Sequence, residues 1–430
     1  MKGGETMKGK LLVFLAIALL STVLCAKEIT FWFAGGDPTL DLPVVQRQVE
    51  EFEKETGIKV KLVVVPWAED PHTKLQVAIM SGKAPDLVKL GSPFEHVLAR
   101  FGVLEPLDGL ISEELKEQLL PSVLTASLYT SITPKDMTGK LISIPYFTDT
   151  RAILYRKDIF QERDVPEPIG WTWSEFVTYA KQLTFDRDGD GKIDVYGFGT
   201  AANYTYQAVM YAWQAGGELM GADDRPAFTT DEFNEGIQFY ADLFNVHKVV
   251  QPGAINVDLW DVRRQLAEGT VAMYIDAGDS AKELQKILGD TLGVGLLPTN
   301  EKTGKFTSYF GSDALVIPKQ SRNKSEAAKL LEWLVDKDHM TEYCIASGFL
   351  PARLDSAADP HFSDSPVVSM YLRQLEDAHA WIAHPEANFI ARTLRVEIQN
   401  AISENSDIAA ALKTAQELVE KQLKDKGFLK

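Results

Sequence analysis

The stretch EITFWFAGGDPTLDLPVVQRQVEEFEKETGIKVKLVVVPW (residues 28–67) decides the fold class. Residues 28–33 are rich in aromatic and β-branched side chains and predict a strand. Residues 42–57 carry apolar side chains at helical spacing and end in a glycine, which predicts a helix. Residues 58–67 are rich in valine and predict a second strand. A strand, a helix and a strand in this order indicate a parallel pair with a helix on its face.

The next segment continues this pattern. Residues 71–82 predict a helix that stops at Gly82, and residues 85–92 predict a third strand after a proline. We therefore expect an α/β fold in which helices flank a parallel sheet. Ligands of such sheets bind beyond the carboxyl ends of the strands. This rule places three loop segments beside a cleft: residues 35–37, residue 67 and residues 91–92.

The N-terminus has the layout of an export leader. Lysines precede an apolar run from Leu11 to Leu20, which is short for a membrane span, and smaller residues follow. We predict a signal peptide over residues 1–26, with Met7 as an alternative start. A second alternative stays open, in which Cys25 becomes the lipidated first residue of an anchored protein. Both alternatives place the mature chain in the periplasm or outside the cell.

Composition limits the partners of the mature chain. The formal net charge is −17, and removal of residues 1–26 takes away three lysines and one glutamate, which makes it about −19. A chain this acidic should repel nucleic acid and anionic membrane surfaces, so neither is an expected partner. Only Cys344 remains after processing, which excludes an internal disulfide. The remaining length of about 400 residues predicts two lobes.

No catalytic motif stands out. The seven histidines are scattered, and the sequence holds neither a G-x-S-x-G elbow nor a phosphate loop that ends in Gly-Lys-Ser/Thr. Residues 197–202 (GFGTAA) match a dinucleotide-binding pattern, but they follow an acidic loop and lead into a poor helix start. Acidic residues are numerous enough to supply a glycosidase pair, so a secreted carbohydrate-active enzyme stays open as an alternative.

Seven segments of the chain carry a family resemblance when they are read in order. They are VVVPWAEDPHTKLQVAIMSGKAPDLVKLGS (63–92), GVLEPLDGLI (102–111), GKLISIPYFTDTRAILYRKDIF (139–160), WTWSEFVTYAKQLTFDRDGDGKIDVYGF (171–198), WQAGGEL (213–219), LAEGTVAMYI (266–275) and SGFLPAR (347–353). Together they resemble the extracellular solute-binding proteins of carbohydrate ABC transporters, the group that includes maltose-binding protein. The resemblance covers nearly the whole mature chain.

This resemblance implies a two-lobed periplasmic-binding-protein fold, each lobe a sheet flanked by helices, with several chain crossings at a hinge. The first lobe would comprise residues 27–147 and 311–347, and the second residues 148–310 and 348–430. The implied function is to bind a mono- or oligosaccharide and to deliver it, by hinge closure and without catalysis, to the permease subunits of an ABC transporter. The resemblance implies a monomer that requires no cofactor.

Sugar recognition needs fixed donors and acceptors for hydroxyl groups and flat aromatic side chains for the apolar ring faces. On these grounds and by the resemblance we nominate twelve ligand-binding residues: Asp37, Trp67, Ser92, Asp149, Tyr204, Tyr206, Trp213, Asp276, Asp279, Phe310, Ser312 and Arg353. Trp260 and Trp381 are further stacking candidates. The set is rich in aspartate and poor in arginine and lysine, which favours a neutral sugar or polyol over a sugar phosphate. Maltose-binding protein has a stacking tryptophan near Asp279 that this sequence lacks, which argues against a maltodextrin.

The segment TFDRDGDGKIDVYGF (residues 184–198) resembles a calcium loop. The carboxylates of Asp186, Asp188, Asp190 and Asp194, with a glycine at the sixth place, satisfy the first half of an EF-hand loop. The twelfth place is Gly197 where an EF-hand has glutamate, and a strand pattern follows, so the segment is not an EF-hand. Two interpretations stay open, a structural calcium site formed by these four aspartates and an acidic turn.

Overall fold

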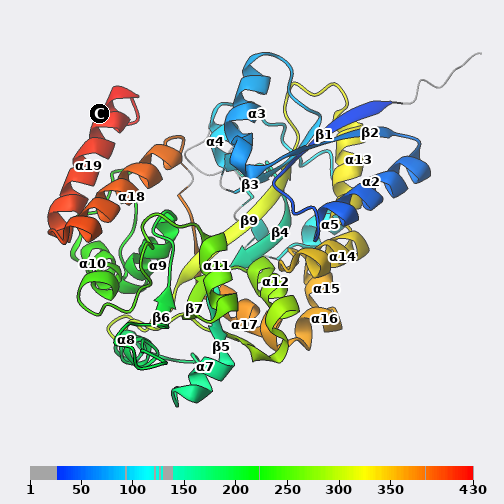
Figure 1. The fold of residues 1–430 in the computed structure, drawn as a ribbon. Helices are drawn as coiled ribbons and strands as arrows, with labels where there is room; N and C mark the ends of the chain where they lie inside the picture. Colours follow the sequence, from blue (N-terminus) through cyan, green and yellow to red (C-terminus); the bar gives the residue numbers. More distant parts are fainter. Residues whose placement is uncertain are drawn as a thin grey trace, which may run out of the picture.

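The computed structural model describes residues 27–92, 94–120, 123–124, 127–128, 139–221, 223–382 and 384–429. The predicted signal peptide, with Cys25, lies outside these residues. The described chain forms two sheets flanked by helices, and Figure 1 shows them in two halves of the molecule. This arrangement confirms the predicted α/β fold.

The N-terminal strands form the parallel part of the first sheet. β1 (Glu28–Ala34) pairs in parallel with β2 (Lys59–Val65) and with β3 (Leu87–Gly91). The predicted strand and helix order of this segment is therefore confirmed. The first helix, α2 (Leu42–Thr56), ends as predicted at Gly57, whose φ of 73° is the left-handed conformation that closes a helix.

A strand from much later in the chain completes the first sheet. β9 (Ser308–Val316) pairs antiparallel with β3 and with β4 (Ile144–Thr150), and parallel with β10 (Ala378–Ala380). The path through the sheet is β10-β9-β3-β1-β2, with β4 also on β9. The first lobe is thus closed by a segment that is remote from it in sequence.

The second sheet is built around β5 (Ala152–Arg156). β5 pairs antiparallel with β7 (Val271–Asp276) and with β8 (Leu292–Gly295), and β7 pairs in parallel with β6 (Tyr196–Gly199). Only Arg151 separates β4 of the first sheet from β5 of the second. The chain therefore passes from one sheet to the other within a single residue.

Helices accompany each sheet. On the side of the first sheet, besides α2, are α3 (Pro71–Met80), α4 (Phe94–Arg100), α5 (Glu113–Gln118), α13 (Lys324–Leu334), α14 (Lys337–Ser347), α15 (Leu354–Ala357) and α16 (Pro360–Ser363), with the 3₁₀ turn η1 (Trp67–Glu69). On the side of the second sheet are α7 (Lys157–Glu162), α8 (Trp173–Gln182), α9 (Thr205–Ala215), α10 (Asp231–Asn245), α11 (Leu259–Glu268), α12 (Gly278–Leu288), η3 (Gly289–Thr291), α17 (Pro366–Leu375), α18 (Ala387–Glu404) and α19 (Ile408–Asp425).

The buried side chains form separate cores for the two halves. One core combines residues between 29 and 147 with residues between 315 and 362. The largest core combines residues between 153 and 297 with residues between 390 and 423. Ala352 and Phe362, beyond the predicted limit at residue 347, also belong to this first core, whereas Leu350 belongs to a separate cluster. The predicted lobe limits otherwise stay a prediction.

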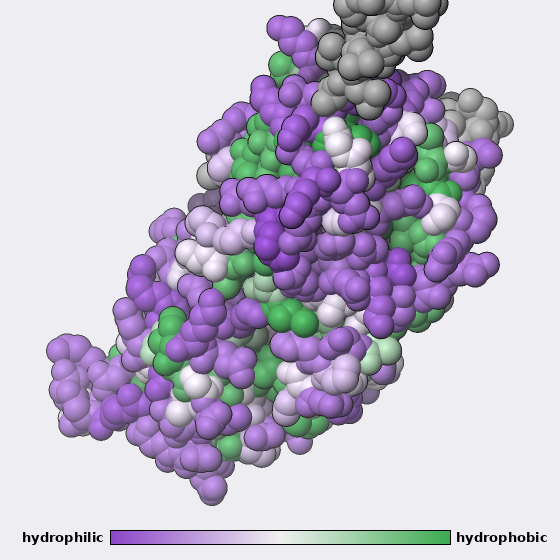
Figure 2. Space-filling view, turned by 90° about the vertical axis from the view of Figure 1, so that its right-hand side faces the viewer, coloured by the Kyte–Doolittle hydropathy of each residue, from purple (hydrophilic) through white to green (hydrophobic). Residues whose placement is uncertain are grey.

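Among the described residues, no helix combines the length and the apolar character that crossing a membrane requires. The face of the molecule in Figure 2 is largely hydrophilic, with apolar residues in small scattered groups. This surface agrees with the charged residues that make up 24% of the chain.

Two glycines let the backbones of the two halves touch. Gly278 opens α12 on the second-sheet side, and Gly348 follows α14 on the first-sheet side. A Cβ atom on Gly278 would overlap the carbonyl oxygen of Gly348, and Gly348 itself has a φ of 87°. Beside them the ammonium group of Lys282 donates to the carbonyl oxygen of Ile345. The side chain of any other residue would separate α12 from α14 here.

We predict that Gly278→Ala lowers the free energy of unfolding by about 1–3 kcal/mol, the usual cost of overpacking. The matched control is Gly109→Ala, because nothing lies within 4 Å of a Cβ atom at that position. Urea denaturation of both variants measures the difference. Equal stability of the two variants would show that α12 and α14 do not approach at these glycines.

Candidate ligand-binding cleft

A cleft between the two halves gathers residues from both. It encloses a cavity of about 560 Å³, within the usual range of small-molecule sites. The first-sheet side supplies the loop after β1, η1, the end of β3 and part of β9. The second-sheet side supplies the start of α9 and of α11 and the turn between β7 and α12. The loops after β1 and β3 confirm that the carboxyl ends of parallel strands face a cleft.

Nine of the twelve nominated residues line this cavity. They are Asp37, Trp67, Ser92, Asp149, Tyr204, Tyr206, Asp276, Asp279 and Ser312. The further stacking candidate Trp260 lines it as well, and its side chain is 54% exposed. These residues come from segments far apart in the sequence and converge only in the folded chain. That they bind a ligand stays a prediction.

The other three nominated residues lie elsewhere. Trp213 is 2% exposed and stacks on the ring of His379 with the centroids 4.6 Å apart. Arg353 is buried and its guanidinium binds the carboxylate of Asp355 at 2.7 Å. Phe310 packs against the first core, while Tyr309 lines the cavity, because neighbouring side chains of a strand point to opposite faces.

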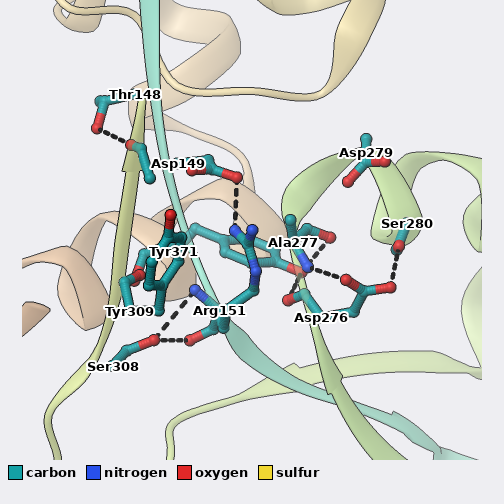
Figure 3. A network of polar contacts seen from close by, with 12 residues as sticks. Thr148, Asp149, Arg151, Asp276, Ala277, Asp279, Ser280, Ser308, Tyr309 and Tyr371 are labelled. Atoms are coloured by element: carbon teal, nitrogen blue, oxygen red, sulfur yellow. Dashed lines mark hydrogen bonds and ion pairs between the residues drawn. The ribbon is translucent and has the colours of Figure 1, made fainter. Parts of the chain in front are cut away.

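A buried ion pair stands where the chain crosses between the sheets. A guanidinium nitrogen of Arg151 lies 2.5 Å from a carboxylate oxygen of Asp149 (Figure 3). The guanidinium carbon lies 5.2 Å and 5.0 Å from the ring centroids of Tyr206 and Tyr309. Burial raises the pKa of Asp149, and the neighbouring guanidinium opposes that rise. Both charged side chains line the cavity, so the pair forms part of its wall.

A second group of charges lies across the cleft at the end of β7. The guanidinium of Arg263 lies 3.6 Å from the carboxylate of Asp276 and 3.5 Å from that of Asp279, and it also binds Glu283. The hydroxyl of Ser280 donates to Asp276, as Figure 3 shows. Burial, and next the charge of Asp276, raise the pKa of Asp279 to about 6. One cation therefore serves three carboxylates, two of which line the cavity.

The third cation of the cleft is Lys89 on β3. Its ammonium group binds the carboxylate of Asp313 and donates to the carbonyl oxygen of Ala34 at 2.9 Å. It lies 4.5 Å from the ring centroid of Phe33. Lys89 is 2% exposed, so this pair is nearly withdrawn from water.

The expectation of a site poor in arginine and lysine is therefore wrong. Arg151, Arg263 and Lys89 line the cavity, and each is held by at least one carboxylate. The sequence carried one signal for the first of them, since Arg151 directly follows the predicted crossing at residues 145–150. The carboxylate partner of Lys89 is Asp313, which is remote in sequence, and the partners of Arg263 lie on β7 and α12. No local sequence pattern indicated that these two cations would line the cleft.

The acidic loop lies between α8 and β6, outside the cleft lining. Carboxylate oxygens of Asp186, Asp188 and Asp194 lie within 4.8 Å of one another. Asp186 accepts hydrogen bonds from the N–H groups of Gly189 and Gly191, each at 2.7 Å, and these bonds lower its pKa. The fourth nominated ligand, Asp190, binds the ammonium group of Lys192 at 3.0 Å and stands apart from the group of three. Calcium binding stays a prediction.

Comparisons with known proteins agree with this architecture. A family model described as bacterial extracellular solute-binding protein matches residues 37–341. A binding protein of Brucella abortus (strain 2308) is 26% identical over 86% of this chain and 87% of its own length. The galactooligosaccharide-binding protein of Bacillus subtilis (strain 168) is 24% identical over 89% and 87%. The structure of an ABC transporter solute-binding protein from Thermotoga lettingae TMO, bound with α-D-tagatose, is 26% identical, covers 92% of this chain and 99% of its own, and has a TM-score of 0.78.

We predict that Asp149→Ala lowers the free energy of unfolding by about 3–5 kcal/mol, because it leaves the guanidinium of Arg151 buried without its carboxylate partner. Asp158→Ala is the matched control, since that carboxylate binds Arg156 at 2.7 Å but is 46% exposed, and its loss should cost about 1 kcal/mol or less. Chemical denaturation measures both. The double variant Asp149→Ala/Arg151→Met should recover part of the loss, and equal costs for the two single variants would contradict the buried pair.

For the acidic loop we predict that Ca²⁺ raises the melting temperature and that a chelator lowers it, because a ligand that binds only the folded state stabilises it. Asp188→Asn should abolish the effect, since it removes one of the three clustered carboxylates. Asp190→Asn, outside that cluster, should keep it. Identical melting curves for calcium-loaded and metal-stripped protein would leave the loop as an acidic turn.

Proposed function

The chain belongs to the bacterial extracellular solute-binding proteins, and from this premise we propose that it binds a neutral sugar or polyol outside the cell membrane and delivers it to the permease of an ABC transporter. The observation that carries the proposal is the composition of the cleft. Its walls combine carboxylates, ion-paired arginines and exposed aromatic rings from both halves. Relatives whose names state a sugar ligand support the proposal, the galactooligosaccharide-binding protein among them.

The charges of the cleft suit hydroxyl groups. Carboxylates such as Asp37, Asp149 and Asp279 accept hydrogen bonds from hydroxyls, and the guanidinium of Arg151 donates to them. Trp67 and Trp260 are 48% and 54% exposed and line the cavity, so each can cover the apolar face of a sugar ring.

The same charges favour a ligand without negative charge. Within the described lining, each of the three cations is already bound by carboxylates, and the lining holds more carboxylates than cations. An anionic sugar would have to displace one of these internal partners or accept repulsion from the surplus. A sugar phosphate or uronate is therefore a poor ligand for this cleft.

Transport would follow from closure of the two halves around the ligand. The chain passes from the first sheet to the second at Arg151 and returns to the first in β9. Few chain segments therefore join the two halves and would have to bend when they close. A ligand that contacts both halves favours the closed state by its differential affinity for it. The closed form would then dock on the permease.

We propose export by the signal peptide of residues 1–26, with lipidation at Cys25 as the less favoured alternative. We further propose that the protein is a monomer and needs no cofactor.

A secreted carbohydrate-active enzyme is the second candidate. Asp279 is the observation in its favour, because a carboxyl group with a pKa near 6 resembles a general acid. Against it, the carboxylates of Asp149, Asp276 and Asp313 are each bound to a cation of the cleft, an arrangement that fixes their positions in the wall. We therefore prefer binding without turnover.

We predict that neutral sugars or polyols raise the melting temperature of the protein, while uronates and sugar phosphates do not. Small-angle scattering with a saturating neutral hit should show a smaller radius of gyration, since closure brings the halves together. The hit should be recovered unchanged after prolonged incubation. An unchanged radius at saturation would refute the clamp, and new products in the incubation would favour the enzyme.

A further inference from the structure

The cleft continues into a second chamber. A cavity of about 410 Å³ adjoins the first and shares six lining residues with it: His72, Gly91, Ser92, Tyr204, Tyr206 and Tyr309. Its own walls also come from both halves, with α3 and α4 on one side and α18 on the other. The second chamber is thus a prolongation of the same interlobe cleft and not a separate surface hollow.

The two chambers differ in charge. Among the described residues that line the second chamber, none is an aspartate, glutamate, lysine or arginine. The first chamber holds several charged side chains of both signs. The second instead presents amides, hydroxyls and the aromatic rings of Trp381 and Phe94. It is suited to a neutral group that offers hydroxyls and an apolar face.

Two side-chain amides on opposite walls of this chamber have no hydrogen-bond partner among the described residues. Gln76 stands on α3, one turn after His72 and on the same helix face. Asn388 stands near the start of α18. Neither amide makes a hydrogen bond with the described residues, whereas Asn203 nearby donates to Val257 and accepts from Gln399. An amide offers both donors and an acceptor, which a pair of sugar hydroxyls can match.

The ring of His72 contributes to the wall between the chambers. It stacks on Phe94 with the centroids 4.2 Å apart and meets the ring of Trp67 edge-on at 5.7 Å. Burial lowers its pKa, so at neutral pH it adds no positive charge to either chamber. The passage between the two chambers is therefore aromatic and neutral on this side.

We propose that the ligand is an oligosaccharide of at least two units, with one unit in the charged chamber and the next in the uncharged chamber between Gln76 and Asn388. This inference rests on the proposed sugar-binding function and deepens it. A monosaccharide or a linear polyol would fill the first chamber only and would leave the two amides without a partner from the ligand.

The test compares each sugar with its own oligomers. Glucose, maltose and maltotriose form one series, galactose and galactobiose a second, and arabinose and arabinobiose a third, with tagatose and mannitol as single-unit probes. Thermal shift selects the series that binds, and calorimetry gives the dissociation constants. We expect the oligomer to bind at least about 10-fold more tightly than its monomer, because it makes additional hydrogen bonds and aromatic contacts.

Variants locate the second unit. Gln76→Ala and Asn388→Ala should each weaken the oligomer by about 3- to 10-fold, the effect of one lost hydrogen bond, and leave the monomer unchanged. Asn400→Ala is the matched control, because Asn400 is an exposed asparagine of the same helix α18 outside both chambers. All three substitutions lie at partly or fully exposed positions, so the melting temperature without ligand should stay constant.

The outcomes separate the inference from the function on which it rests. A monosaccharide or polyol that binds as tightly as any oligomer, with both amide variants unaffected, overturns the two-unit ligand and leaves the sugar-binding function standing. Equal weakening of monomer and oligomer by the amide variants also overturns it. A protein that responds to no carbohydrate of any series overturns the proposed function and this inference with it.

Discussion

The ion pair of Asp149 and Arg151 is the interaction on which the arrangement of the two halves depends. It stands at the single residue between β4 of the first sheet and β5 of the second. A buried guanidinium must keep its partner, because an unpaired charge in the interior is costly. The cation also lies against Tyr206 of the second half and Tyr309 of β9. The same two side chains therefore stabilise the crossing between the sheets and form part of the cavity wall.

The charges of the cleft are organised as internal pairs. Lys89 with Asp313, Arg151 with Asp149 and Arg263 with its three carboxylates hold one another at fixed positions. Fixed donors and acceptors need little reorganisation when a polar ligand arrives, which conserves binding free energy. Because each cation is already bound by a carboxylate and carboxylates are in surplus, the cleft offers hydrogen-bonding groups and no unpaired positive charge to a ligand. This is how a site full of ions could accept the neutral sugar that we propose as its ligand.

The cleft also changes its chemistry along its length. The charged chamber lies where the chain crosses between the halves, and the uncharged chamber lies between α3 and α18, away from the crossing. Lys89, Asp149 and Asp276 of the charged chamber stand on strands β3, β4 and β7. Side chains on α3 and α18 belong to opposite halves, so their separation depends on how far the halves have closed. On the side of α12 and α14 the two halves are in contact at Gly278 and Gly348.

The local pattern of residues 28–92 determined the parallel strands β2, β1 and β3 and the helices between them. The hydrophobic periodicity that specifies each of these elements lies within one contiguous stretch of the sequence. It also placed Asp37, Trp67 and Ser92 in a cleft, because loops after parallel strands meet at one sheet edge. The resemblance supplied Asp149, Tyr204 and Asp276.

The sequence could not choose between Phe310 and Tyr309 as the side chain that faces the cleft, since a shift of one residue in a strand reverses the side-chain direction. Nor could it foresee that Arg353 is buried, or that Lys89 and Arg263 enter the cleft with carboxylate partners. Those positions were decided by the tertiary structure, because burial and ion pairing are set by which distant segments pack together.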